Sequence, residues 1–247
     1  MTKELSDSLL VLVCTYNERA NLPSLFERIN AFVPNAHILV VDDNSPDGTS
    51  EWVEEYQLSH SSVSLNRRSG KLGLGTAIRA GMHYAIENGY EWLLNLDADL
   101  SHDPKSIPDL LAKQLQSDVV IGSRYVPGGG MVGCSWRRVF VSKCANSYAR
   151  WLIGWTVHDC SSAFRLYRVA KLKTLNLDGL KGVGYGFLEE VLWHLLNQGA
   201  RLSEVGIIYS ERREGKSKIS IKEAWSTITS LHSVASLQRA SRKAIGS

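Results

Sequence analysis

The 247-residue sequence lacks any segment that could cross a bilayer, because its longest apolar runs, such as residues 9–14, fall far short of the ~20 residues that a spanning helix needs. The N-terminus also lacks the basic-then-apolar order of a signal peptide, so we expect any membrane contact to be peripheral. The four cysteines include no Cys-x-x-Cys pair, and two fall in apolar stretches. This usage predicts reduced thiols in a cytoplasmic protein.

An excess of one charge is missing too. The 28 Lys and Arg against 25 Asp and Glu leave a net charge of only +3, which gives no reason to expect a nucleic-acid partner. Hydrophobic residues at 44% and charged residues at 21% exclude fibres, coiled coils and wholesale disorder. No Pro-, Ser- or Gly-rich linker divides the chain, so we predict one α/β domain over residues 1–219, followed by an amphipathic helix and tail over 220–247.

The basic residues are concentrated in two places. From Glu211 to the end the chain carries a net +5, which leaves −2 for the rest. A second basic patch, in a stretch without carboxylates, consists of Arg137, Arg138, Lys143 and Arg150. Such patches suit phosphates or an anionic membrane surface, although a solvated helix face has the same composition.

Runs rich in Val, Ile and Leu alternate along the chain with segments of helical period. The strand candidates are residues 9–14, 38–41, 92–96, 119–122 and 205–209. The helix candidates include residues 21–33, 49–57, 76–88 and 107–116. This alternation predicts a Rossmann-like, mostly parallel sheet with helices on both faces. In such sheets ligands bind beyond the carboxyl ends of the strands.

Polar residues cluster where four of these runs end. The clusters are residues 15–18, 42–48, 97–99 and 122–125. Turn chemistry explains part of this pattern, since Asn, Ser, Pro, Asp and Gly favour strand-to-helix turns. Because the four clusters share one edge of the predicted sheet, we predict a common site there.

Asp97 and Asp99 flank one small residue after an apolar run. In an extended strand end both carboxylates point the same way, and they repel one another unless a cation intervenes. Oxygen ligands select a hard divalent ion, and Mg²⁺ is commonly held by one or two carboxylates together with substrate phosphates. The pair therefore predicts Mg²⁺ or Mn²⁺ with a diphosphate-containing substrate.

Cations and glycines precede the helix candidate at residues 76–88. The stretch 67–76 could place backbone amides near an anion, or its glycines could simply cap the helix. It matches neither a Walker A nor a complete Rossmann pattern, and Gly215-Lys216-Ser217 has Ser210 where a P-loop needs glycine. A P-loop nucleotidase is therefore disfavoured.

In combination, these motifs resemble family 2 glycosyltransferases of GT-A fold, closest to the dolichol-phosphate or polyprenol-phosphate mannosyltransferases. The resemblance covers roughly residues 9–220 and is carried by residues 15–18, 42–49, 71–76, 97–102, 122–125, 164–165 and 212–218.

The resemblance implies roles for the matching positions. The guanosine part of GDP-mannose would be held by Tyr16, Glu18, Asp42 and Asp43. The diphosphate and metal would lie at Asp97, Ala98 and Asp99, with Asp99 the principal metal ligand and Ser101 beside it. Contacts to phosphates would come from Arg124, Arg212 and Lys218.

The resemblance also implies a mechanism without a general base. A lipid monophosphate is mostly a dianion at neutral pH, so it can attack the anomeric carbon directly once cations have brought the two anions together. Arg124 and Arg138 are the candidates for holding the acceptor phosphate, with Ser142 a weaker one. Attack from the back face would invert the sugar and give a β-linked polyprenyl phosphate mannose and GDP.

Contact with the cytoplasmic face of a membrane, with or without a membrane-protein tether, would supply the lipid. The stretch 136–155 reads as an amphipathic helix or helix pair that suits an interface, although a core-packed helix with a basic outer face is an alternative. For the tail, residues 220–247, packing against the protein and contact with a membrane surface are likewise both possible interpretations. Glu189 and Glu190 could assist the acceptor site or the dipole of a helix start.

Other functions remain open on sequence grounds. UDP-glucose is the alternative donor. A sugar-nucleotide pyrophosphorylase would also use paired carboxylates, but the N-terminal part has no glycine-rich triphosphate loop. A non-catalytic partner subunit could retain the fold, although the intact Asp97, Asp99, Arg124 and Arg212 disfavour it.

Overall fold

The computed structural model describes residues 8–211 and Ser236. The division at residue 219, the amphipathic helix expected over 220–247, Arg212 and Lys218 therefore lie outside the described residues, Ser236 excepted.

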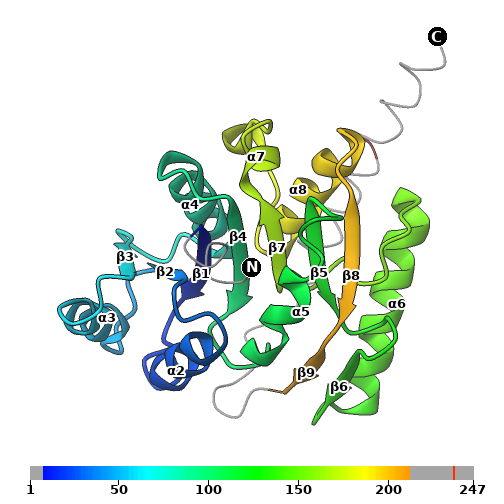
Figure 1. The fold of residues 1–247 in the computed structure, drawn as a ribbon. Helices are drawn as coiled ribbons and strands as arrows, with labels where there is room; N and C mark the ends of the chain where they lie inside the picture. Colours follow the sequence, from blue (N-terminus) through cyan, green and yellow to red (C-terminus); the bar gives the residue numbers. More distant parts are fainter. Residues whose placement is uncertain (1–7, 212–235, 237–247) are drawn as a thin grey trace.

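A seven-stranded sheet forms the centre of the molecule, with strand order β3-β2-β1-β4-β7-β5-β8 (Figure 1). Its strands are β1 (Leu9–Thr15), β2 (His37–Asp42), β3 (Val63–Arg67), β4 (Trp92–Asp97), β5 (Val119–Ser123), β7 (Arg165–Arg168) and β8 (Leu202–Gly206). All neighbours are parallel except β7, which runs antiparallel to both β4 and β5. The predicted mostly parallel α/β sheet is confirmed.

Helices connect these strands and cover both faces of the sheet. They are α2 (Leu22–Phe32), α3 (Thr49–Gln57), α4 (Leu74–Glu87), α5 (Ile107–Leu111), α6 (Trp136–Ile153), α7 (Val169–Leu172) and α8 (Tyr185–Asn197), with 3₁₀ turns at Pro104–Ser106 and Leu177–Gly179. None of the helices in the described part is both long and apolar enough to span a bilayer.

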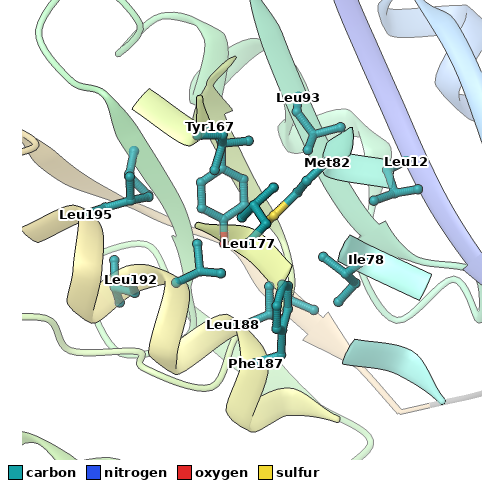
Figure 2. Close-up of a cluster of buried hydrophobic side chains, with 14 of the residues drawn as sticks. Leu12, Ile78, Met82, Leu93, Tyr167, Leu177, Phe187, Leu188, Leu192 and Leu195 are labelled. Atoms are coloured by element: carbon teal, nitrogen blue, oxygen red, sulfur yellow. The ribbon is translucent and has the colours of Figure 1, made fainter. Parts of the chain in front are cut away.

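Alternation of side chains along the strands divides the interior into two cores. In β1, Leu10 and Leu12 point to the face covered by α4 and α8, whereas Val11 and Val13 point to the face covered by α2. Figure 2 shows the first core, where Leu12 of β1 and Met82 of α4 lie in one cluster with residues of α8. Because both faces are covered, β1, β2, β4 and β5 consist mainly of apolar residues, which is why their continuous apolar runs could be recognised in the sequence.

The strand predicted over residues 205–209 is wrong as a single element. The chain leaves the main sheet at Gly206 and enters a small parallel pair formed by β6 (Gly130–Val132) and β9 (Ile208–Ser210). The N–H of Ile207 donates to the Ser123 carbonyl while its own carbonyl accepts from Gly130, so this residue bonds to both sides of the transition. A side chain at Gly206 would overlap the backbone of residues 127–129, which allows only glycine there.

Other boundaries shift less. The helix expected over 107–116 ends as α5 at Leu111, and the stretch 136–155 forms one helix, α6, rather than a pair. The short strands β3 and β7 and the long helix α8 were not predicted.

We expect Gly81→Ala to lower the free energy of unfolding by about 1–3 kcal/mol, because a Cβ on this residue of α4 would overlap the side chain of Leu12 in β1. Urea denaturation measures the change. Gly70→Ala is the matched control, since a Cβ there meets only open space. A stability of Gly81→Ala equal to that of wild type would contradict the close approach of α4 to the sheet.

Candidate functional site

A cavity of about 230 Å³ opens at the carboxyl ends of β1, β2 and β4, where the start of α4 borders it. Its lining is rich in charged side chains. It consists of Cys14, Thr15, Tyr16, Glu18, Asp43, Lys71, Gly73, Leu74, Ala77, Asp97, Ala98, Asp99 and Tyr185. The structure thus brings three of the four predicted polar clusters to one site. The fourth, residues 122–125, does not line this cavity, so the expectation of one site for all four is met only in part.

The two adjacent carboxylates at the end of β2 have different surroundings. Asp42 is fully buried, does not line the cavity, and accepts hydrogen bonds from Thr15 Oγ1 (2.7 Å), Ser45 N and Oγ (2.8 and 2.6 Å) and Ser50 Oγ (2.7 Å). Burial alone would raise the pKa of Asp42, but these bonds hold it below its ordinary value. Asp42 therefore stays ionised and organises the loop that follows β2.

Asp43 does line the cavity. Its carboxylate accepts from Arg68 Nη1 (2.5 Å) and from the backbone N–H of Gly73 (2.7 Å), just before α4 begins. Arg68 also donates to Thr76 Oγ1 at 2.6 Å. The amide that the glycine-rich stretch was expected to offer to an anion is thus bound by a carboxylate of the protein itself.

The loop after β1 supplies an aromatic wall. Lys71 Nζ lies 4.1 Å from the ring centroid of Tyr16, a cation–π contact at the cavity. Nearby, Glu18 accepts a hydrogen bond from Asn21 Nδ2 at 2.7 Å. An aromatic ring, a cation and carboxylates side by side suit a nucleobase and ribose.

Asp97, at the end of β4, and Asp99 also line the cavity, with Ala98 between them. Leu100 has a positive φ of 60°, a conformation that bulky residues rarely adopt, and the turn lets Ser101 N donate to Asp99 Oδ1 at 3.0 Å. Three such non-glycine residues occur in the described chain, at Asn17, Asn44 and Leu100, each just beyond a strand that borders the cavity. Asparagine adopts this conformation readily, so of the three only Leu100 is strained, and it lies directly after Asp99.

The donor set fits a hard divalent ion only in part. Of the four carboxylates that line the cavity, Asp97 and Asp99 lie together at the end of β4, and Ser101 Oγ is buried without a hydrogen-bond partner in the described part of the chain. No group of three His, Cys, Asp or Glu side chains among these residues could hold an ion by itself. Such a set suits Mg²⁺ or Mn²⁺ that takes its remaining oxygen ligands from a substrate.

His102 contacts the backbone of Asp97 at the start of this turn. Its ring is buried, stacks on Phe164 (centroids 5.3 Å apart), and accepts at Nδ1 from the backbone N–H of Asp97 at 3.4 Å. Burial lowers the pKa of His102 to about 4, even though the charge of Asp99 acts to raise it. The imidazole is therefore neutral near pH 7, and its 3.7 Å approach to the Asp97 carboxylate is not an ion pair at that pH.

Arg124, at the end of β5, does not line the cavity but belongs to a buried network. Its Nε and Nη2 donate to the two oxygens of Asp159 at 2.8 and 2.7 Å, and Nη2 also donates to Ser161 Oγ. Burial opposes ionisation of Asp159, but the hydrogen bonds and charge of Arg124 hold the pKa of that carboxyl below its usual range. Nη1 of Arg124 has no hydrogen-bond partner within residues 8–211.

Asp159 is the residue of this network that sequence reasoning missed. It lies 35 positions from Arg124, in a segment without strand or helix signal, and no local pattern could have identified it. Glu204 of β8 in turn accepts from the backbone N–H groups of His158 and Asp159, which ties the segment to the sheet.

Arg138 of α6 lies near the same tyrosine ring as Arg124, that of Tyr209. It donates to Glu211 Oε1 at 2.7 Å and to the Tyr209 hydroxyl at 3.2 Å. The Arg124 and Arg138 guanidinium carbons lie 5.6 and 5.9 Å from the Tyr209 ring centroid, so this ring joins two of the predicted phosphate ligands. Ser142 hydrogen-bonds to the Tyr125 hydroxyl at 2.6 Å.

The two neighbouring glutamates of α8 also differ. Glu190 accepts from the backbone N–H groups of Lys181 and Gly182 at 2.9 and 2.6 Å, which holds the loop before the helix. Glu189 is buried, and its Oε2 has no hydrogen-bond partner in the described residues. Burial raises the pKa of the Glu189 carboxyl to about 8, against the charge of Arg165, which lowers it. Neither glutamate lines the cavity.

We expect Glu189→Gln to stabilise the protein increasingly as the pH rises. The unfolded chain ionises this carboxyl near pH 4.5, whereas the folded chain keeps it protonated up to about pH 8, so wild type loses stability relative to the variant between these values. The gain at pH 8 should be on the order of 4 kcal/mol. Urea denaturation at pH 5 and pH 8 tests this, and an advantage that shrinks with pH would mean that Glu189 is ionised beside Arg165.

Known proteins resemble this chain in sequence and in fold. Residues 10–175 match Glycosyl transferase family 2. The chain is 42% identical over 220 residues to polyprenol monophosphomannose synthase of Mycolicibacterium smegmatis. This alignment covers 87% of this chain and 83% of that protein. It is 39% identical over 212 residues to undecaprenyl-phosphate mannosyltransferase of Micrococcus luteus, covering 86% and 87% respectively.

Among solved structures, glucosyl-3-phosphoglycerate synthase of Mycobacterium tuberculosis in complex with Mn²⁺, UDP and glucosyl-3-phosphoglycerate superposes with a TM-score of 0.67. The match has 20% sequence identity and covers 96% of this chain and 84% of that one. At this identity the likeness concerns the fold alone, and it confirms the GT-A architecture. The match over residues 10–175 and the relatives of about 40% identity show that the chain belongs to glycosyl transferase family 2.

Proposed function

We propose that this protein transfers mannose from GDP-mannose to a polyprenyl phosphate with inversion, giving polyprenyl phosphate β-mannose and GDP. The observation that carries the proposal is the cavity with paired Asp97 and Asp99 in a chain 42% identical to a polyprenol monophosphomannose synthase. The names of both relatives support mannosyl transfer to a polyprenyl phosphate. The names of the relatives do not state the nucleotide of the donor, and the proposal of a guanosine nucleotide rests on the family resemblance alone.

The donor would occupy the cavity. Tyr16, Glu18 and Asp43 line the part that suits the nucleoside, and Asp42 acts on them through the loop that it organises rather than by contact. Asp97, Asp99 and Ser101 would hold Mg²⁺ or Mn²⁺, which would neutralise the diphosphate as it leaves. Arg212 and Lys218, outside the described residues, remain the candidates for further phosphate contacts.

The acceptor would lie at Arg124 and Arg138. A polyprenyl phosphate is mostly a dianion at neutral pH and needs no base, so the task of these residues is to hold it in line behind the anomeric carbon. Arg124 is rigid because Asp159 binds two of its nitrogens, and Nη1 is the one available to a phosphate. To bind a phosphate, the guanidinium of Arg138 would have to leave Glu211 or contact both groups at once. Ser142 lies four positions after Arg138 on α6.

Peripheral attachment to the cytoplasmic face of a membrane, with a membrane-protein tether as a further option, fits a lipid acceptor. No nucleic-acid partner is proposed.

A donor panel tests the function. The full chain is incubated with Mg²⁺, a polyprenyl phosphate, and either GDP-mannose or UDP-glucose, and the lipid product is identified by mass spectrometry. We expect a mannosylated lipid phosphate from GDP-mannose, with β configuration by NMR. A product formed only with UDP-glucose would show that UDP-glucose, and not GDP-mannose, is the donor. No product with either donor would favour a non-catalytic subunit. GTP with mannose 1-phosphate, the substrates of a pyrophosphorylase, serves as the negative control.

A further inference from the structure

The two arginines assigned to the acceptor phosphate each have a carboxylate partner. Arg124 donates from Nε and Nη2 to Asp159 at 2.8 and 2.7 Å, and Arg138 donates from Nη1 to Glu211 at 2.7 Å. Both guanidinium groups lie near the ring of Tyr209. Within the described chain the two cations are thus matched by two anions, so the pair of arginines carries no net positive charge for a phosphate dianion.

The first of these carboxylates is a fixed part of the fold. Asp159 is 0% exposed, and besides the guanidinium it accepts hydrogen bonds from the backbone N–H groups of Arg124 (3.0 Å) and Ser162 (3.1 Å). Its own backbone N–H donates to Glu204 of β8. Asp159 cannot leave Arg124 unless this part of the interior opens, so that ion pair stays closed whether or not an acceptor is bound.

The second carboxylate is held less firmly. The side chains of Glu211 and Arg138 are 43% and 30% exposed, and such an ion pair contributes little because water screens both charges. The backbone of Glu211 is fixed separately, since its N–H donates to the Val132 carbonyl at 3.0 Å, where the small sheet of β6 and β9 lies beside α6 (Figure 1). Rotation of the Glu211 side chain therefore separates the pair while β9 stays in place.

Arg138 keeps a second partner when this carboxylate leaves. Its Nη2 donates to the Tyr209 hydroxyl at 3.2 Å, and its guanidinium carbon lies 5.9 Å from the centroid of that ring. Tyr209 is only 8% exposed, and its backbone pairs with His102 in an isolated β-bridge. Release of Glu211 thus leaves Arg138 held beside Arg124, with one positive charge no longer compensated.

We infer that Glu211 is an exchangeable counter-ion of Arg138, which the phosphate of the acceptor displaces when it binds. The inference rests on the proposed function, since it takes Arg138 as a ligand of the acceptor phosphate. A carboxylate and a phosphate both accept from the same guanidinium nitrogens, so one replaces the other. Because any phosphate must first displace the carboxylate, Glu211 lowers the affinity of the site for all of them, and free phosphate ions, which have no other contacts, are kept from Arg138.

An acceptor titration of Glu211→Gln tests the exchange. The variant keeps the length of the side chain but removes its charge, so the KM for a polyprenyl phosphate should fall about fivefold, the factor that an exposed ion pair contributes. The effect should lie in KM, since in wild type the carboxylate has left Arg138 before the chemical step. Glu51→Gln is the matched control, because it breaks an exposed pair with Arg67, and neither residue lines the cavity. An equal KM for the two variants would overturn the inference.

Tyr209→Phe distinguishes a counter-ion from a positioning residue. This variant keeps the ring but removes the hydroxyl that accepts from Arg138, so its acceptor KM should rise. Opposite changes in KM for Tyr209→Phe and Glu211→Gln support the exchange. A rise in both would mean that Glu211 orients Arg138 for the acceptor, and it would overturn the inference.

Calorimetry with inorganic phosphate tests the exchange without any donor or lipid. Glu211→Gln should bind phosphate about fivefold more tightly than wild type. Glu211→Gln/Arg138→Ala should lose this gain, which would assign it to Arg138. In the transfer assay, inorganic phosphate should compete with a short, water-soluble polyprenyl phosphate more strongly in Glu211→Gln than in wild type.

These measurements separate the inference from the proposed function. Tighter phosphate binding by Glu211→Gln that depends on Arg138, without transfer from any donor, would uphold the exchange and reject the proposed function. Mannosyl transfer by wild type, together with a Glu211→Gln variant whose phosphate affinity and acceptor KM equal those of wild type, would do the reverse.

Discussion

Asp99→Asn should reduce transfer at least about a thousandfold while leaving the fold intact. The side chain keeps its shape but loses the charge through which the cavity would hold a divalent ion and the donor diphosphate, and removal of such an electrostatic contact costs two to three orders of magnitude or more in rate. Since Asp97 no longer repels a second carboxylate, the metal-free variant should be at least as stable as wild type.

The measurement is kcat/KM with Mg²⁺ or Mn²⁺ restored to chelator-treated enzyme, together with thermal unfolding in the absence of metal. Asp109→Asn, an exposed carboxylate in the first turn of α5, is the control and should retain activity. Wild-type turnover by Asp99→Asn would remove Asp99 from the metal site.

The second large effect is on stability. Asp159→Asn should lower the free energy of unfolding at pH 7 by about 3–5 kcal/mol, because it leaves the guanidinium of Arg124 buried without its countercharge. It should also raise the KM for the acceptor, since Arg124 loses the bidentate contact that orients it. Glu51→Gln, which breaks an exposed pair with Arg67, should cost less than about 1 kcal/mol.

The pH dependence of this effect has a definite sign. The pKa of Asp159 is held below its ordinary value in the folded protein, so its contribution is fully present above the unfolded value of about 3.9 and is lost as the pH falls through the folded pKa. Urea denaturation of wild type and Asp159→Asn should therefore differ most at neutral pH and converge in acid. A constant difference from pH 7 to pH 3 would show that packing, not charge, carries the effect.

Local pattern was enough to predict the framework. Apolar runs between helical segments predicted β1, β2, β4, β5 and the parallel sheet, because strands covered on both faces are hydrophobic throughout. The rule that ligands bind at the carboxyl ends of such strands then predicted that Tyr16, Asp43, Asp97 and Asp99 would meet, and they line one cavity. Short or charged elements gave no such signal, as in β7, where the fully buried Arg165 interrupts the apolar pattern.

Tertiary structure alone decided what neighbouring carboxylates do. Asp42 and Asp43 are adjacent at a strand end, where successive side chains point to opposite sides, so one is buried under hydroxyl donors and the other faces the cavity. In the same way, Glu189 is buried without a partner for Oε2 in the described residues, while Glu190 accepts two backbone amides. The pairing of Arg124 with Asp159 required the fold as well, because a contact between residues 35 positions apart depends on how distant segments pack and leaves no periodic trace in the sequence.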